Sequence, residues 1–266
     1  MKSLRIRGGS GLGDSIYVRP IAEHYMRQGH PVEVCTKYPD VFLGSGARIA
    51  EFSRMNIDVT AHYATRKFES STNQWQDVCI TAKVAPTLPL RFDWTVRNHR
   101  LIEDVLARAN GRPIILVHGG RTPMGRKDNF GAELLPEKHG FDAALTALDG
   151  RFTVRVGGND ERYALETDLN LSGQTSVSDL IDLARVCDGM LAQCSLAIPL
   201  CEAFGKPLVC VWSAKGLAAK HHFVSAITSH KVFSAQTSQW CLDAWPADRI
   251  AGVVSAALCV RQLEAA

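Results

Sequence analysis

The chain has 266 residues, of which 46% are hydrophobic, and a formal net charge of +3. That much apolar material supports two lobes with packed cores and excludes wholesale disorder. No apolar stretch approaches the roughly 20 residues needed to cross a bilayer, and the opening Met-Lys-Ser-Leu-Arg-Ile-Arg breaks into glycine before a signal-peptide apolar region can form, so we expect a cytoplasmic protein without a transmembrane segment.

The first half of the chain alternates strands with helices. Residues 4–7 predict a strand, residues 8–14 a glycine-rich turn, residues 15–28 a helix and residues 31–35 a second strand. A strand, helix and strand joined by short links form a βαβ unit, which predicts a parallel sheet. The alternation continues through 40–75, with a short strand near 57–59, a strand over 77–81, a loop over 86–93 and a helix over 98–109.

The segment Asn110-Gly111-Arg112-Pro113 is the strongest domain-boundary signal, and the alternating pattern then starts again. The second half is expected to contain a strand over 114–118, a helix over 138–148, a strand over 152–156, a helix from about Glu161, a helix over 179–187, a strand over 189–192, a helix over 197–204, a strand over 208–212 and a terminal helix over 249–263. Strands rich in Val, Ile and Leu that alternate with helices predict an α/β fold of two doubly wound parallel sheets. We place the domains at 1–111 and 112–248, with a C-terminal helix at 249–266.

The eight cysteines favour free thiols over disulfides. Four of them lie within or beside apolar runs: Cys35, Cys79, Cys187 and Cys210. No C-x-x-C pair is present, and buried free thiols are typical of a reducing compartment. Cys187, Cys194 and Cys201 recur every seven residues, but no histidine has matching ligand spacing, so we predict no zinc site.

Charge is divided unevenly between the two halves. Residues 1–112 hold 16 Lys and Arg against 11 Asp and Glu, a net of +5, whereas residues 113–266 hold 14 against 16, a net of −2. A basic first lobe is consistent with an anionic partner or with an ordinary solvated surface.

Glycines collect where the predicted strands end, at 8–13, 119–120 and 157–158. In doubly wound sheets ligands bind beyond these carboxyl ends, and glycine allows close approach to a ligand as well as a tight turn. A dinucleotide fingerprint fits residues 8–13 only with slipped spacing, and the strand over 31–35 is not followed by the acid that would bind the ribose. No Gly-Lys-Ser/Thr is present, which excludes a P-loop.

Asp14 follows the first glycine turn at a predicted helix start. A carboxylate there can cap the free amides of the helix. It can also act as a general base at the mouth of the first lobe, taking a proton from an attacking hydroxyl. The sequence leaves both roles open.

Two stretches resemble one enzyme family. The first is Arg7-Gly8-Gly9-Ser10-Gly11-Leu12-Gly13-Asp14 followed by Arg19-Pro20, and the second runs from Leu171-Ser172-Gly173-Gln174-Thr175-Ser176 through Cys187-Asp188 to Ala203-Phe204-Gly205-Lys206-Pro207. With weaker agreement around 114–130 and 152–161, the chain resembles glycosyltransferase family 9, the ADP-heptose:lipopolysaccharide heptosyltransferases, over most of its length. The resemblance implies a GT-B fold, in which an acceptor-side N-terminal domain and a nucleotide-sugar-binding C-terminal domain, both Rossmann-like, face each other across a cleft.

The resemblance also implies roles for single residues. Asp14 matches the family's proposed catalytic aspartate, with Gly11, Leu12 and Gly13 in the loop beside it. Lys127 matches a basic residue that meets the donor phosphates, and Asp160 or Glu161, after Gly158, falls where the family has an acid near the nucleoside. Ser195, Leu196 and Ala197 match the turn whose amides hold the pyrophosphate.

One departure from the family concerns the donor sugar. Where the family has Asp-Thr-Gly and then a histidine, this chain has Cys194-Ser195-Leu196 and Pro199. The missing aspartate is the residue that the resemblance assigns to hydroxyls of the donor sugar. A different donor sugar or a weakened site follows.

The chemistry of a donor site does not depend on the resemblance. A nucleoside diphosphate gains negative charge as it leaves, which suits the helix start near Ala197. Arg121, Arg126 and Lys127, on the loop after His118, either add cationic contacts or are solvated. Because amides and basic residues can do the work of a metal, and Asp-x-Asp is absent, we expect no metal and no cofactor. His118 is either an acid/base group or a structural histidine, and Trp212 is the tryptophan best placed to stack on a ligand.

The leading hypothesis is a glycosyltransferase that moves a sugar from a nucleotide-diphosphate donor to a hydroxyl of a glycan or other anionic polymer, with inversion implied by the resemblance. A catalytically weak nucleotide-sugar-binding protein of the same fold is the first alternative. A transferase that modifies hydroxymethylated DNA is a second, although no aromatic and basic nucleic-acid motif is present. A nicotinamide-dependent oxidoreductase is a third, weakened by the missing ribose acid.

Overall fold

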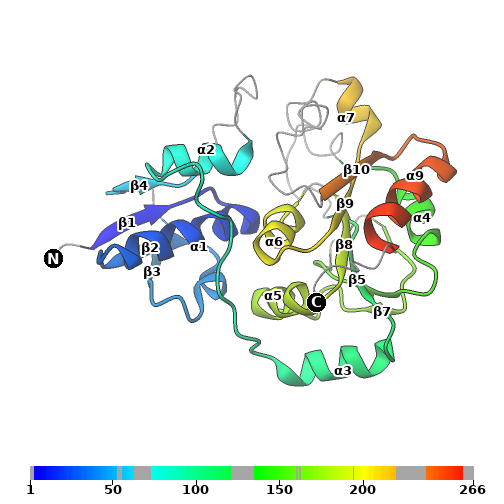
Figure 1. Ribbon diagram of the computed structural model, residues 1–266, viewed down its shortest axis with the longest axis horizontal. Coiled ribbons are helices and arrows are strands. Elements are labelled where there is room, and N and C mark those ends of the chain that lie inside the picture. The colour runs from blue at the N-terminus through cyan, green and yellow to red at the C-terminus, as the bar shows by residue number, and fades with distance from the viewer. Residues whose placement is uncertain are drawn as a thin grey trace.

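Two separate parallel sheets divide the chain between them (Figure 1). The computed structural model describes residues 3–52, 56–62, 73–120, 135–159, 161, 163–193, 195–219 and 238–259. Every pair of neighbouring strands is parallel. The expected α/β fold with two parallel sheets is therefore confirmed. The domain limits at 111 and 248 stay predictions.

The first sheet has four strands in the order β3-β2-β1-β4. Ile6 on β1 and Val34 on β2 are completely buried, and the first helix, α1, packs against these two strands. The elements of this lobe are β1 (Leu4–Arg7), α1 (Leu12–Arg27), β2 (Val32–Thr36), the 3-10 helix η1 (Pro39–Phe42), β3 (Arg48–Glu51), β4 (Val59–Thr60) and α2 (Gln74–Thr81).

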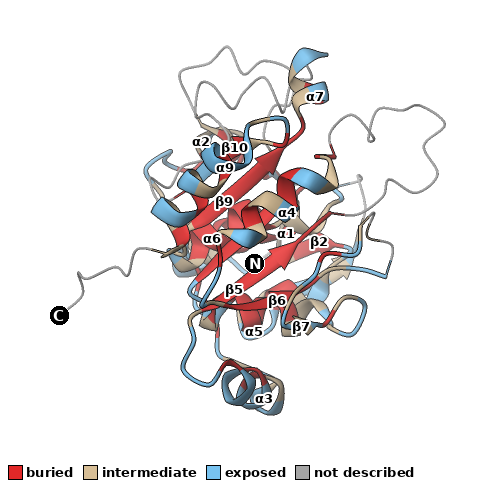
Figure 2. Ribbon diagram, turned by 90° about the vertical axis from the view of Figure 1, so that its right-hand side faces the viewer, coloured by how far each residue is buried: buried red, intermediate tan, exposed pale blue. Residues whose placement is uncertain are grey.

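The second sheet has six strands in the order β10-β9-β8-β5-β6-β7. Its strands β5 and β9 are buried along their whole length (Figure 2), as expected for parallel strands with helices on both faces. The elements of this lobe are α3 (His99–Ala109), β5 (Ile114–His118), α4 (Lys138–Thr146), β6 (Phe152–Arg155), β7 (Leu169–Asn170), α5 (Val177–Val186), β8 (Gly189–Gln193), α6 (Ala197–Phe204), β9 (Leu208–Trp212), α7 (Ala214–Ala218), β10 (Ser238–Leu242), α9 (Ala247–Val254) and the π-helical turn η4 (Ser255–Cys259).

The apolar core runs from one lobe into the other. Alternate residues of β5 point to opposite faces, because side chains alternate along a strand. Ile115 and Val117 belong to a core that includes residues of α4 and α9. Ile114 and Leu116 belong to a larger core that continues into the first lobe. The second sheet is thus joined to the first lobe through one of its two faces.

The prediction of a strand over 77–81 is wrong. These residues form the end of α2, which begins after Asn73. Asn73 Oδ1 accepts the backbone N–H of Gln76, and Gln76 Oε1 accepts the backbone N–H of Asn73. This reciprocal capping box fixes a helix start, and it outweighs the β-propensity of Val78 and Ile80.

The prediction of a helix from about Glu161 is also wrong for the residues that the structure describes. Glu161 instead forms an ion pair with Arg155, with Oε2 at 2.6 Å from the guanidinium Nε. The chain then passes through irregular structure to the short strand β7. The terminal helix predicted over 249–263 is present as α9 and the π-helical turn that follows it, up to Cys259.

Arg19 on α1 fastens the first lobe to the linker between α2 and α3. Its Nη2 donates to the backbone carbonyl of Asp93 at 2.6 Å, and its guanidinium lies over the rings of Phe92 and Trp94, at 4.6 and 5.1 Å from their centroids. Burial lowers the pKa of the guanidinium, and the neighbouring Glu23 opposes that effect. The linker is therefore held by a buried cation.

Asp182 on α5 fastens the same linker to the second lobe. It is completely buried and accepts hydrogen bonds from the Trp94 indole at 2.6 Å, the Arg97 backbone at 2.9 Å and the Asn98 backbone at 2.7 Å. A buried carboxylate needs such donors to offset its lost hydration. The path of the linker past both lobes is thereby fixed.

Two further findings concern the cysteines and the membrane. All described cysteines are free thiols, and all except the half-buried Cys259 are buried, as expected. In the described part of the chain, no helix has both the length and the hydropathy required to span a bilayer.

Candidate functional site

Helices α1 and α6 meet at their N-terminal ends, where the two lobes touch. An ideal Cβ atom built on Gly13 would lie 3.4 Å from Leu196 Cα and 3.7 Å from Pro199 Cγ. Gly13 follows the glycine turn after β1, and Leu196 precedes α6 after β8. Both turns lie beyond the carboxyl ends of parallel strands, where ligands of such sheets bind. The structure thus brings together two of the predicted segments, 11–14 and 195–197.

Asp14 is the third residue of α1 and partly exposed. Its Oδ2 accepts the backbone N–H of Gly11 at 3.0 Å, which caps the helix. No hydrogen bond from the described part of the chain reaches Oδ1. The side chain is therefore held in place through Oδ2. The capping role is observed, and it is compatible with the proposed role as a base.

Gly9 explains why this turn is rich in glycine. A Cβ atom at Gly9 would collide with the Asp14 carboxylate and would lie 2.7 Å from His62 Cδ2. The absence of a side chain at residue 9 thus allows the Asp14 carboxylate and the His62 ring to share the space that a Cβ atom would fill. His62 was not predicted from the sequence, although it comes just after β4 and so lies at the same edge of the sheet.

Two cationic side chains lie over one aromatic ring at this edge of the first sheet. They too were not predicted from the sequence. Phe52 follows β3, and its ring has the Arg7 guanidinium at 5.7 Å and the Lys37 ammonium at 5.4 Å from the centroid. Arg7 ends β1 and Lys37 follows β2. Both cations therefore lie at the carboxyl ends of their strands, on the lobe that contains Asp14.

His118, at the end of β5, orients Ser195 in the turn before α6. Its Nδ1 lies 3.2 Å from Ser195 Oγ. Burial lowers the pKa of His118 to about 4, so the ring is neutral at pH 7 and exchanges one hydrogen bond with the hydroxyl. His118 is thus a buried residue that positions Ser195.

Two backbone N–H groups in the first turn of α6 already have acceptors on Ser195. Ala197 N–H donates to Ser195 Oγ at 3.3 Å, and Ile198 N–H donates to the Ser195 carbonyl at 3.3 Å. Pro199 has no N–H to offer. What this end of the helix offers an anion is chiefly its dipole and the Ser195 hydroxyl.

The other two glycine pairs make room for side chains of the protein itself. Gly120 has φ of +91°, a left-handed conformation, and a Cβ there would collide with Gln193 at the end of β8. A Cβ at Gly157 would collide with the Glu161 carboxylate and approach His118. Gly158 beside it is exposed. Gly120 and Gly157 therefore allow close packing at the strand ends, and Gln193, which the sequence did not reveal, lies at the same edge.

Glu161 is almost entirely buried, with 2% of its side chain exposed. Its Oε2 accepts hydrogen bonds from Arg155 at 2.6 Å and Ser172 at 3.3 Å. Burial raises the pKa of this carboxyl, while Arg155, Ser172 and the Gly119 backbone oppose the rise. The carboxylate stands beyond the end of β6, where the resemblance expects an acid near the nucleoside.

Several predicted residues lie outside the described part of the chain: Arg121, Arg126, Lys127, Asp160 and Cys194. Trp212 is 1% exposed and belongs to the core, so its ring is not available for stacking. Among the described residues, no three His, Cys, Asp or Glu side chains are arranged to hold a metal ion.

Comparisons with known proteins agree on the fold. No protein-family model and no curated protein sequence matches the chain. Its structure is similar to that of ADP-heptose lipopolysaccharide heptosyltransferase II of Escherichia coli, with 13% identity, 97% of this chain and 99% of that chain covered, and a TM-score of 0.61.

Two further solved structures are similar over nearly the whole chain. The glycosyltransferase family 9 protein of Veillonella parvula is 10% identical, with 97% of each chain covered and a TM-score of 0.60. The Escherichia coli heptosyltransferase WaaC, solved with ADP-2-deoxy-2-fluoro heptose, is 9% identical, with 96% and 98% covered and a TM-score of 0.54. The structural resemblance to family 9 heptosyltransferases and the GT-B fold are confirmed.

Proposed function

We propose that the protein is a glycosyltransferase that moves a sugar from a nucleotide-diphosphate donor to a hydroxyl acceptor, with Asp14 as general base. The observation that carries this proposal is the contact between Gly13 and Leu196. Because of this contact Asp14, which follows Gly13 and is partly exposed, lies near the N-terminus of α6. A base and an anion-stabilising helix end on facing lobes are the two groups that displacement at an anomeric carbon needs.

The donor diphosphate is assigned to the turn from Ser195 to Ala197. The partial positive charge of the α6 N-terminus favours the negative charge that develops on the leaving group. His118 fixes the Ser195 hydroxyl at the same place. In this proposal Gly11, Leu12 and Gly13 border the diphosphate from the first lobe, and Glu161 with Gly158 borders the nucleoside.

The residues outside the described part complete the proposed donor site. Arg121 and Lys127 are proposed to meet the phosphates, Asp160 to lie near the nucleoside and Cys194 to lie near the donor sugar. No metal has a part in this scheme, because the helix end and the basic residues supply the positive charge.

An anionic acceptor is supported by Arg7 and Lys37. Both cations flank Phe52 at the carboxyl edge of the first sheet, the edge that Asp14 and His62 share. Their charge favours an acceptor with carboxylate or phosphate groups. The ring between them offers an apolar surface to the same acceptor.

The test separates the two roles of Asp14. Asp14→Asn keeps an oxygen that can accept the Gly11 N–H but cannot take a proton, so we expect a loss of about 10²–10⁴ in turnover of nucleotide sugars with nearly unchanged stability. Release of nucleoside diphosphate from a panel of donors measures the turnover.

A matched control is Asp179→Asn. Asp179 is also the third residue of its helix, α5, and its Oδ2 accepts the Ser176 N–H at 2.9 Å, but it lies outside the proposed site. This variant should keep full turnover. Equal turnover in Asp14→Asn and the parent protein would remove Asp14 from the reaction. Donor binding without turnover for every acceptor would instead favour the nucleotide-sugar-binding protein.

A further inference from the structure

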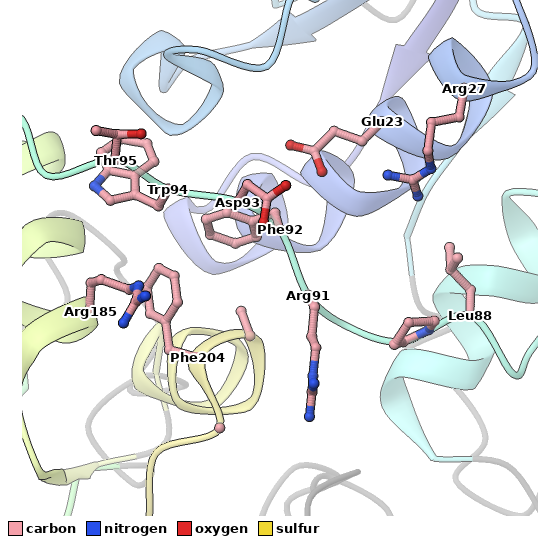
Figure 3. A pocket seen from close by; sticks show the side chains of 13 residues that line it. Glu23, Arg27, Leu88, Arg91, Phe92, Asp93, Trp94, Thr95, Arg185 and Phe204 are labelled. Carbon is pink, nitrogen blue, oxygen red and sulfur yellow. The ribbon is translucent and has the colours of Figure 1, made fainter.

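A cavity lies at the opposite end of α6 from the proposed donor site. It has a volume of about 720 Å³ and lies between the last turns of α1, α5 and α6 and the linker (Figure 3). The eight residues of α6 span about 12 Å, so this space, which we call the hinge pocket, is separate from the turn at Ser195. Its volume falls within the usual range of pockets for small ligands.

Three exposed arginines from three different elements line the hinge pocket: Arg27 of α1, Arg91 of the linker and Arg185 of α5. Figure 3 shows Arg27 and Arg185 reaching toward this space from opposite sides, with Arg91 on the linker between them. No ion pair or side-chain hydrogen bond of Arg91 or Arg185 occurs within the described residues. Like charges gathered around one space repel each other, and an oxyanion bound among them removes that cost.

Two carboxylates, Glu23 and Asp93, lie in the same lining. Glu23 is paired with Arg19 at 2.9 Å and also attracts Arg27, so the charge that is left for a ligand lies chiefly on Arg91 and Arg185. Asp93 is exposed. Carboxylate oxygens accept hydrogen bonds from hydroxyl groups. The lining therefore combines cations for an oxyanion with acceptors for hydroxyls.

The wall behind these groups is already formed. Phe92 of the linker packs edge-on against Phe204 of α6, with centroids 5.2 Å apart, and the Arg19 guanidinium lies over the Phe92 ring. Both lobes and the linker thus build the pocket together. A ligand that bridges Arg27 and Arg185 holds the two lobes in one relative orientation.

We propose that the hinge pocket binds a small phosphorylated polyol, such as a sugar phosphate. The arginines bind the phosphate, Asp93 and Glu23 accept hydrogen bonds from the hydroxyls, and the bound ligand stabilises this arrangement of the lobes. The proposal stands whether or not the protein transfers sugars, because it involves none of the proposed donor-site residues.

The experiment is calorimetric titration of the full chain with a hexose 6-phosphate, with inorganic phosphate and the neutral hexose as comparison ligands. We expect the hexose 6-phosphate to bind more tightly than inorganic phosphate and the neutral hexose not to bind. Arg185→Gln and Arg91→Gln should each weaken binding at least about tenfold, as expected for loss of a charge-assisted contact. Arg108→Gln, an exposed arginine of α3 paired with Asp104, is the matched control and should bind like the parent.

The outcomes that overturn the proposal are distinct from failure of the transferase. Absence of binding at millimolar hexose 6-phosphate overturns it, as does equal weakening in Arg185→Gln and Arg108→Gln. Simple competition by a nucleoside diphosphate, together with unchanged affinity for the hexose 6-phosphate in Arg185→Gln, would place the phosphate in the donor site and also overturn it. Circular dichroism of each variant checks that these exposed substitutions leave the fold intact.

Discussion

The indole Nε1–H of Trp94 donates a hydrogen bond of 2.6 Å to Oδ1 of Asp182, and this bond joins the linker to the second lobe. Asp182 is completely buried and receives two backbone N–H groups as well. Asp182 is therefore a main anchor of the linker on the second lobe, as Arg19 is on the first. Because the side chain of Asp182 is completely buried, the loss of one donor leaves part of its desolvation cost uncompensated.

Asp182→Asn is expected to lower the free energy of unfolding by about 2–4 kcal/mol, because the amide keeps one acceptor and turns an NH₂ group toward donors. Urea denaturation measures the change. Asp104→Asn, which breaks the exposed pair with Arg108, should change stability by less than about 0.5 kcal/mol. If both variants lose the same amount, Asp182 is not the anchor described above.

Gly13→Val is expected to destabilise the protein by about 1–3 kcal/mol, because its added methyl groups press on Leu196 and force α6 away from α1. Gly252→Val in α9 is the matched control, since a Cβ there meets nothing within 4 Å; it should cost little or stabilise the helix slightly. Thermal unfolding compares the two variants. A tolerated Gly13→Val would mean that the two lobes can separate at this point without cost.

Acid is expected to destabilise the protein through His118. Burial lowers its pKa to about 4, whereas the unfolded chain has a value near 6.5. The unfolded state therefore binds the proton more tightly, and the stability from His118 is present above about pH 6.5 and is lost as the pH falls toward 4. The loss between pH 7 and pH 5 is about 2 kcal/mol. Urea denaturation at the two pH values should show a smaller drop for His118→Gln than for the exposed-site control His139→Gln.

The buried cysteines are expected to resist alkylation in the native state. Burial raises the pKa of the Cys79, Cys187 and Cys241 thiols to about 12, and the thiolate is the reactive form. The half-buried Cys259 should react first among the described cysteines, and all eight should react in urea. Peptide mapping after a short exposure to iodoacetamide measures the order. Modification of Cys187 as fast as Cys259 would contradict the packed core.

The sequence predicted the parts of the fold that local patterns determine. The strands over 114–118 and 208–212 are nearly continuous apolar runs that follow a proline, and the strand over 4–7 alternates apolar residues with arginines before a glycine turn; the structure has all three at those places. The end of α2 was predicted as a strand because Val78 and Ile80 are β-branched. The capping box of Asn73 and Gln76, which starts the helix, lies at the other end of α2. The strands β3, β7 and β10 were not predicted, because each is an edge strand of its sheet and lacks the continuous run of buried apolar residues that marks a central strand.

The sequence could predict which strand ends contribute to the candidate site, but not which residues contact one another there. Asp14 and the turn at Ser195 follow from the rule that ligands bind at carboxyl ends of parallel strands. The pairing of Gly120 with Gln193, and of Gly9 with His62, joins residues more than fifty positions apart. No spacing in the sequence encodes such a contact, so these residues emerge only when the chain is folded.

Arg19 gains its hydrogen bonds from segments that are distant in the sequence: the carbonyls of Val41 and Leu43 after α1, and that of Asp93 in the linker. A fragment that ends before residue 90 would bury part of this guanidinium without an acceptor, and a fragment that begins after residue 99 would leave the Asp182 carboxylate without its donors. Each lobe alone therefore lacks hydrogen-bonding partners for a buried charged side chain, and only the intact polypeptide supplies them. Melting should accordingly be cooperative across both sheets, with a single calorimetric transition for the whole molecule.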